Sequence, residues 1–106
     1  MRLHDDLRKC VVYLGDPAPN DETGLSLVRG TGFMVFHGKF AGSYLITAGH
    51  VAKEFEDRPF GIRLNDRSSL ARVDRIDEAK WWYHPDSTVD VAVMQYEPPD
   101  WADVSP

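Results

Sequence analysis

The sequence has very little cysteine: Cys10 is the only one among 106 residues. A single cysteine cannot form an internal disulfide, so the chain is compatible with a reducing compartment. Long hydrophobic runs are also lacking. The first six residues (MRLHDD) do not resemble a signal peptide, and no window approaches the length of a membrane span. These absences predict a cytoplasmic protein that does not contact a membrane.

An excess of positive charge is likewise absent. The chain has 12 basic and 17 acidic side chains and a net charge of −5. Its basic residues are scattered, and Arg72 and Arg75 alternate with Asp74 and Asp77. Proteins that bind nucleic acid need a basic stripe that follows the phosphate backbone. The charge pattern therefore predicts no nucleic-acid partner.

The composition indicates one small, loop-rich β domain. Hydrophobic residues make up 42% of the chain, enough for one core, and seven prolines and eight glycines are spread along it. Short apolar or alternating runs predict six strands, at residues 10–14, 31–36, 43–48, 60–64, 70–77 and 90–96. Residues 15–25 read as an exposed loop, and residues 81–83 (WWY) add bulk before a turn. Six short strands of this kind favour an antiparallel β-barrel that is closed or nearly closed.

One helical turn is expected after the third strand, over residues 49–54, with Thr47 as its candidate cap. Residues 1–9 are charged and form an N-terminal arm in this interpretation. Residues 10–97 form the barrel, and residues 98–106, which contain three prolines, form an extended exit segment. The sequence contains no internal repeat and no second domain.

Two residues stand out chemically. His50 follows a strand that ends in small residues, which hold an imidazole at a rim rather than in the core. An imidazole can act as a general base near neutral pH if a carboxylate on its other nitrogen fixes the tautomer. Asp90 is the best candidate for that carboxylate, because it stands directly before an apolar strand where a free charge would be costly. Taken singly, each residue could also be an ordinary turn residue.

The residues around this pair carry a specific resemblance. Residues 30–33 (GTGF), 45–51 (LITAGHV) and 90–93 (DVAV) resemble the N-terminal half of a trypsin-like serine peptidase, in the disulfide-free bacterial branch of the chymotrypsin fold. The similarity covers roughly residues 10–97, in the family's order and spacing. It implies a six-stranded antiparallel Greek-key barrel, with His50 as general base and Asp90 as its orienting partner. The implied reaction is hydrolysis of a polypeptide substrate.

The chain departs from this family in one decisive respect. The second barrel is missing, and with it the Gly-Asp-Ser-Gly-Gly segment that supplies the nucleophile and the oxyanion hole. None of the six serines lies in a Gly-x-Ser-Gly context, so each reads as a turn or surface hydroxyl. By itself the chain is therefore expected to be inactive, as a fragment that needs a second barrel to provide the serine. The alternative is a non-catalytic barrel, derived from a peptidase, that binds peptides or proteins.

Other readings of single residues are less favoured. Cys10 lies in an apolar run, which indicates a buried structural thiol rather than a nucleophile. His4, His37 and His84 lack the spacing of zinc ligands, and neither a metal nor another cofactor is predicted. Trp81, Trp82 and Trp101 are expected in the core or at a barrel end. An isolated half should also expose the apolar face that its twin would cover, so self-association is expected.

Overall fold

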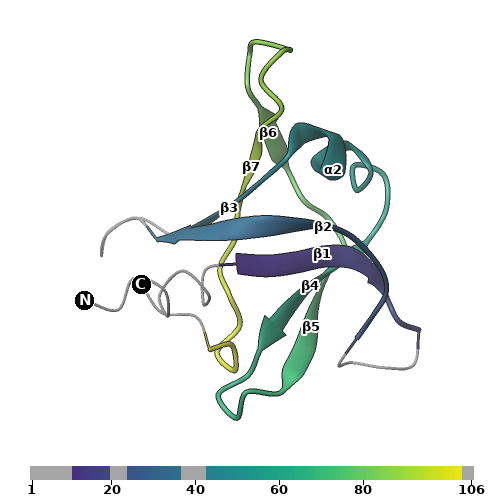
Figure 1. Cartoon of the computed structure of the whole chain (residues 1–106), viewed down its shortest axis with the longest axis vertical. Helices are drawn as coiled ribbons and strands as arrows, with labels where there is room; N and C mark the ends of the chain where they lie inside the picture. The colour runs from purple at the N-terminus through teal and green to yellow at the C-terminus, as the bar shows by residue number, and fades with distance from the viewer. Residues whose placement is uncertain (1–10, 20–23, 37–42, 104–106) are drawn as a thin grey trace.

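Alternating apolar residues form most of the strands in the computed structural model, which describes residues 11–19, 24–36 and 43–103 (Figure 1). The strands are β1 (Val11–Pro17), β2 (Leu25–Phe36), β3 (Ser43–Thr47), β4 (Phe60–Asn65), β5 (Ala71–Ile76), β6 (Trp81–Tyr83) and β7 (Ala92–Gln95). One short helix, α2 (Gly49–Lys53), follows β3. The expectations for residues 1–9, Cys10 and residues 104–106 lie outside the described residues. The predicted all-β antiparallel class is confirmed.

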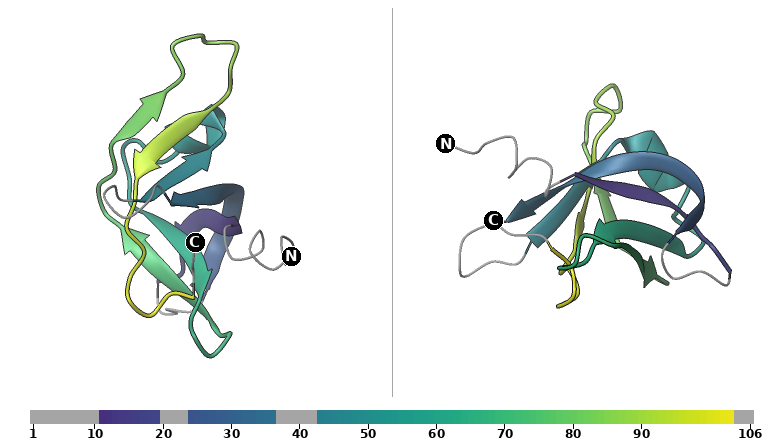
Figure 2. Two further views of the ribbon diagram at one scale, coloured as in Figure 1. Left: turned by 90° about the vertical axis from the view of Figure 1, so that its left-hand side faces the viewer. Right: turned by 60° about the horizontal axis from the view of Figure 1, so that its bottom comes forward.

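All seven strands belong to one sheet, in the order β5-β4-β1-β2-β3-β7-β6, with every neighbouring pair antiparallel. Two hairpins, β4–β5 and β6–β7, lie at opposite ends of the molecule, and the long strands β1 and β2 run between them (Figures 1 and 2). The edge strands β5 and β6 are consecutive in the chain and are separated by residues 77–80 alone. Within the described residues no ladder joins them, so the sheet is not closed by hydrogen bonds.

The described residues form seven strands, where the sequence predicted six. The additional strand is β6, where Trp81, Trp82 and Tyr83 pair with Met94, Val93 and Ala92 of β7. Strands β1 and β2 also extend into the stretch expected to be a loop: β1 continues to Pro17 and β2 begins at Leu25. Register shifts after Leu14 and after Asp16 allow these two strands to stay paired through their bend.

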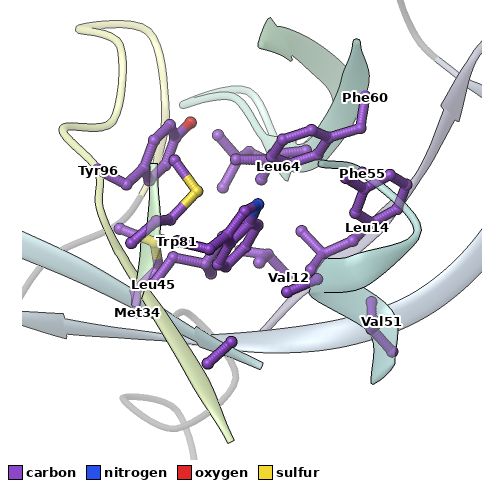
Figure 3. Packing of buried hydrophobic residues seen from close by; sticks show 14 of the residues in the cluster. Val12, Leu14, Met34, Leu45, Val51, Phe55, Phe60, Leu64, Trp81 and Tyr96 are labelled. Atoms are coloured by element: carbon purple, nitrogen blue, oxygen red, sulfur yellow. The ribbon is translucent and has the colours of Figure 1, made fainter. Parts of the chain in front are cut away.

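The core lies on one face of the sheet, which curves around it. Val12 and Leu14 of β1, Met34 of β2 and Leu45 of β3 are almost wholly buried. Phe55 stacks on Phe60 at a ring-centroid distance of 4.6 Å. The Trp81 ring lies in the middle of this cluster, 5.9 Å from that of Phe60 (Figure 3). The core position predicted for Trp81 is confirmed.

The other two tryptophans differ from Trp81. Trp82 points to the opposite face of the sheet and is 48% exposed, so its predicted packing in the core or at a barrel end is wrong. Trp101 is partly buried against the core, and the Arg72 guanidinium lies 4.3 Å from its ring centroid. Ala102 forms an isolated bridge with Asp66, and the Asp103 N–H donates to the Asn65 carbonyl over 2.8 Å. These contacts hold residues 101–103 against the end of β4.

Within the described part of the chain, no helix is long and apolar enough to cross a membrane.

Candidate functional site

His50 is the second residue of α2, which starts immediately after β3. The N–H groups of Val51 and Ala52 donate to the Ala48 carbonyl over 3.0 and 3.1 Å, so the helix begins at Ala48 without a side-chain cap. The prediction that Thr47 caps this helix is wrong. Its hydroxyl instead donates to the Thr31 carbonyl of β2 over 2.7 Å, because Thr47 is still part of β3 and lies beside β2.

The placement of α2 depends on a glycine in β2. A Cβ added to Gly30 would lie 2.8 Å from Cγ2 of Val51, a separation that real Cβ contacts essentially never show. Gly30 therefore lets Val51 and Ala52 reach the core, where both are buried. A side chain at residue 30 would push the helix, and His50 with it, away from the sheet.

Charged side chains at the C-terminal end of α2 connect this helix to β1 and β2. The Arg29 guanidinium makes two hydrogen bonds to the Asp16 carboxylate, of 3.0 and 2.9 Å, and lies 3.6 Å from a Glu54 carboxylate oxygen. Arg58 adds a contact of 3.3 Å to Asp16. The hydrogen bond from Arg29 lowers the pKa of Asp16 most, and the charge of Arg58 adds to it. The carboxylate is therefore ionised at neutral pH and joins β1, β2 and the residues around α2.

Asp90 lies two residues before β7, and the structure brings it to His50 although the two are 40 positions apart in the chain. Its Oδ1 accepts the His50 backbone N–H over 2.8 Å, and its Oδ2 lies 2.5 Å from the His50 Nδ1. The imidazole lowers the pKa of Asp90 through this hydrogen bond, and the backbone N–H groups of His50 and Gly49 lower it further. Asp90 is therefore ionised at neutral pH and can only accept.

An ionised Asp90 determines which ring nitrogen carries the proton. Because the carboxylate has no hydrogen to give, Nδ1 of His50 must be the donor, and in the neutral ring Nε2 then keeps the lone pair. The side chains of His50 and Asp90 are 74% and 54% exposed. The pair is therefore accessible from solvent.

Gly49 allows the carboxylate to come this close. A Cβ at this position would lie 2.9 Å from Oδ1 of Asp90. The sequence showed small residues before His50. Gly49, one of them, leaves space for the Asp90 carboxylate as well as for neighbouring backbone. The two predicted site residues are in contact, and their catalytic role stays a prediction.

A hollow of about 380 Å³ adjoins Asp90, between α2 and the β6–β7 hairpin. Lys53 and Glu56 line it on the helix side, and Tyr83 and Val89 on the hairpin side. Sequence reasoning did not single out Lys53, Glu56 or Tyr83. The sequence shows only that these three residues lie within seven positions of His50 or Asp90. Many other residues do so too, and this nearness does not identify them as part of a site.

No hydroxyl of the described residues forms a hydrogen bond with His50. Ser43 donates to the Tyr96 carbonyl, Ser26 to the Asp16 carbonyl and Thr88 to the Asp86 carboxylate. Within the same residues, no three His, Cys, Asp or Glu side chains are grouped as metal ligands would be. The Nδ1 of His84 accepts the Asp86 N–H over 3.0 Å, as part of a turn. His4 and His37 lie outside the described residues.

Comparison of the chain with family models, with curated proteins and with solved structures found no match in any of the three.

Proposed function

We propose that this chain is the first barrel of a trypsin-like serine endopeptidase, carrying the general base His50 and its orienting carboxylate Asp90. A second barrel supplies the serine. The observation that carries the proposal is the double contact of one carboxylate with His50, to the backbone N–H and to Nδ1. A carboxylate bound in this way fixes both the tautomer and the direction of the ring, which a general base in acyl transfer requires.

The proposed chemistry divides between the two barrels. Nε2 of His50 takes the proton of the serine hydroxyl as its oxygen attacks the peptide carbonyl, and Asp90 stays ionised and stabilises the imidazolium. The imidazolium then gives this proton to the departing amine, which leaves an acyl-enzyme. Water hydrolyses the ester through the same proton transfers in reverse order. The second barrel also supplies the oxyanion hole.

The strand order supports a Greek-key barrel of the expected type. Strands β5 and β6 are the two edges of the sheet and follow each other in sequence, with β5 paired to β4 and β6 paired to β7. In this proposal they are two halves of one bent strand, whose halves pair with opposite neighbours and so bring the ends of the sheet together. Counted in this way, the seven segments correspond to the six strands of the barrel.

Exposed apolar residues on the outer face of the sheet support the proposal that another domain or protein binds there. Val11, Tyr13, Phe33 and Val35 of β1 and β2 point away from the core and are 38 to 52% exposed. We call these four residues the outer apolar face. Exposed apolar surface of this kind is typical of an interface between proteins or domains. The second barrel is its proposed occupant, and a second copy of the chain would occupy it when that barrel is absent.

The test begins with the coding DNA beyond Pro106. The proposal expects the reading frame to continue into strands with a Gly-Asp-Ser-Gly-like segment. The encoded polypeptide is then assayed for casein hydrolysis and for labelling by a fluorophosphonate, which reacts with activated serines. Asp90→Asn should lower turnover about 10⁴-fold, because the carboxylate that holds the His50 ring in the productive tautomer is then lost. A stop codon directly after Pro106 would overturn the proposal for this polypeptide.

Two matched variants separate catalysis from folding. His84→Ala removes an exposed histidine whose ring contacts Asp86 rather than Asp90, so activity should survive this change and be lost in His50→Ala. Asp86→Asn is the corresponding control for Asp90→Asn, since Asp86 caps Thr88. Equal losses in the site and control variants would contradict the assigned roles.

The second candidate is a non-catalytic binding barrel, which the outer apolar face favours independently of His50 and Asp90. This function predicts that partner binding is unchanged in His50→Ala and Asp90→Ala. Binding should be lost when Phe33 is made polar. Isothermal titration measures this binding. Because both functions place a partner on this face, turnover distinguishes them: a peptidase loses it in His50→Ala and Asp90→Ala, whereas a binding barrel has none to lose.

A further inference from the structure

The segment that carries the base and the hairpin that carries the acid face each other across the hollow beside Asp90. Gly49, Lys53 and Glu56 line one side, and seven residues of the hairpin line the other: Tyr83, His84, Pro85, Ser87, Val89, Asp90 and Val91. Because this space separates them, side-chain packing alone does not fix their relative position. The β3–β7 ladder joins the two segments at Thr47 and Ala92, and the hydrogen bonds that cross the hollow add to this connection beyond the end of the ladder.

These hydrogen bonds lie at two places. At the rim, Asp90 accepts from the backbone and from Nδ1 of His50. On the other side of the hollow, the Tyr83 hydroxyl donates to Oε1 of Glu56. Among the described residues, no other side-chain hydrogen bond joins residues 49–56 to residues 81–91. Besides the β3–β7 ladder, which pairs Thr47 with Ala92, the bond between Tyr83 and Glu56 is thus the one hydrogen bond between these described segments that does not involve His50 or Asp90.

We propose that Tyr83 and Glu56 are positioning residues for this pair: their hydrogen bond holds the hairpin with Asp90 at a fixed distance from the helix with His50. The proposal rests on the proposed function for its catalytic meaning. Neither residue touches substrate or the reacting atoms, and both act through the backbone segments that they join.

Both partners are firmly connected to the groups that they position. Tyr83 pairs with Ala92, two residues from Asp90, and the adjacent His84 N–H donates to the Val91 carbonyl over 3.2 Å. On the other side, Glu56 follows directly on the buried Phe55, whose N–H donates to Ala52 of α2 over 3.0 Å. A shift at Tyr83 would therefore be passed to Asp90, and a shift at Glu56 to α2.

The surroundings of Tyr83 favour a lasting hydrogen bond. The ring is partly buried against the core, and the Lys53 ammonium lies 5.8 Å from its centroid. Burial raises the pKa of the Tyr83 hydroxyl, and the Glu56 carboxylate raises it further. The hydroxyl therefore remains protonated and able to donate at neutral pH.

Backbone hydrogen exchange at His50 measures the proposed effect directly. The His50 N–H lies in the first turn of α2, where no helix carbonyl can accept it, so its protection reports the contact with Asp90. In Tyr83→Phe, which removes only the hydroxyl, exchange at His50 should become about tenfold faster, as expected when one hydrogen bond holding a locally opening segment is lost. Glu56→Ala should give the same increase, and Glu56→Gln, which keeps an acceptor oxygen, should restore slow exchange.

Tyr96→Phe is the matched control. Tyr96 also donates its hydroxyl to a carboxylate, that of Asp74 over 2.7 Å, but it lies in the core at the end of β7. His50 exchange should stay within twofold of the wild type in this variant. Unchanged exchange in both Tyr83→Phe and Glu56→Ala would overturn the proposal, as would equal acceleration in Tyr96→Phe.

A carboxyl ¹³C titration of Asp90 adds a second readout. If Tyr83→Phe loosens the pair, the titration midpoint of Asp90 should rise from its lowered position toward the ordinary aspartate value. A midpoint that does not move would count against the inference. Both measurements use the chain without substrate or a second barrel. Failure of the peptidase proposal would appear as absent turnover and would leave these results as they are.

Discussion

The two faces of the sheet are built from the same strands, yet the apolar residues of one face are buried and those of the other are exposed. In β1 and β2, Val12, Leu14 and Met34 are at most 3% exposed, whereas their neighbours Val11 and Phe33 are 38% and 52% exposed. Successive side chains of a strand point to opposite faces, so neighbours in sequence meet different surroundings. Hydrophobicity alone does not tell which of two adjacent residues enters the core.

The core of this fold lies on the inner face, whereas the outer face exposes apolar side chains to solvent. Phe55, Phe60, Trp81 and the buried aliphatic residues fill the inner side (Figure 3). The outer apolar face continues toward the candidate site. Ile46 and Val93 pair on its side of β3 and β7, four residues before His50 and three after Asp90.

The largest effect is expected from breaking the inner face. Leu45 is fully buried in β3, so Leu45→Ala should lower the free energy of unfolding by about 2–5 kcal/mol, from lost transfer energy and the cavity left behind. Urea unfolding followed by tryptophan fluorescence gives the value. Val35→Ala on the outer face is the control and should cost much less. Equal costs would contradict the division between the two faces.

The next effect concerns the contact that seats α2 on the sheet. Gly30→Ala places a methyl group 2.8 Å from Val51 and should destabilise the fold by about 1–3 kcal/mol. In the double variant with Val51→Ala, the added methyl group has room, so the combined loss should be smaller than the sum of the single losses. Strict additivity in urea unfolding would show that the two residues do not meet.

A smaller effect on stability is expected when the pH is lowered and Asp90, exposed to water in its pair with His50, takes up a proton. The folded-state pKa of Asp90 is lowered from its ordinary value of 3.8, so the stabilisation is present above that value and is lost as the pH falls through the folded pKa. Asp90→Asn should therefore have a flatter dependence of stability on pH in this acid range. Urea midpoints across the range test this. Asp86→Asn removes a different carboxyl group whose pKa is also lowered. It shows whether a flatter pH dependence of stability is specific to Asp90.

The smallest effect on stability is expected from the outer apolar face. Phe33→Thr keeps a good strand former and removes exposed apolar surface, so the free energy of unfolding should change by about 0.5 kcal/mol or less. Self-association, measured by sedimentation velocity, should fall in the same variant. A wild-type chain that stays monomeric at high concentration would contradict the assignment of this face to a partner.

Much of the fold could be predicted from local pattern. The alternation of residues 70–77 predicted a half-exposed strand, and β5 is partly buried along most of its length. β6 was missed because three successive aromatic residues show no alternation, and its strand conformation comes from pairing with β7. The ends of β1 and β2 were missed for a similar reason, since Gly15 and Pro17 are typical of loops and pair only through a bulged register.

The candidate site divides in the same way. His50 and Asp90 were selected from their flanking residues, and the structure brings them into contact. The role of Thr47 was predicted wrongly because a threonine before a helix is ordinarily a cap, whereas here a neighbouring strand offers its hydroxyl a carbonyl. Glu56 and Tyr83 could not be found, because their hydrogen bond joins segments 27 residues apart.

The sequence by itself determined the elements whose signal is local: the antiparallel strands, the helical turn and the two chemically distinctive residues. Backbone geometry and hydrophobic alternation act over a few residues, and those few residues are enough to read them. Only the tertiary structure decided which apolar face is covered, where the sheet ends, and which groups hold the imidazole in place. Those outcomes depend on contacts between residues far apart in the chain, which no short stretch of sequence contains.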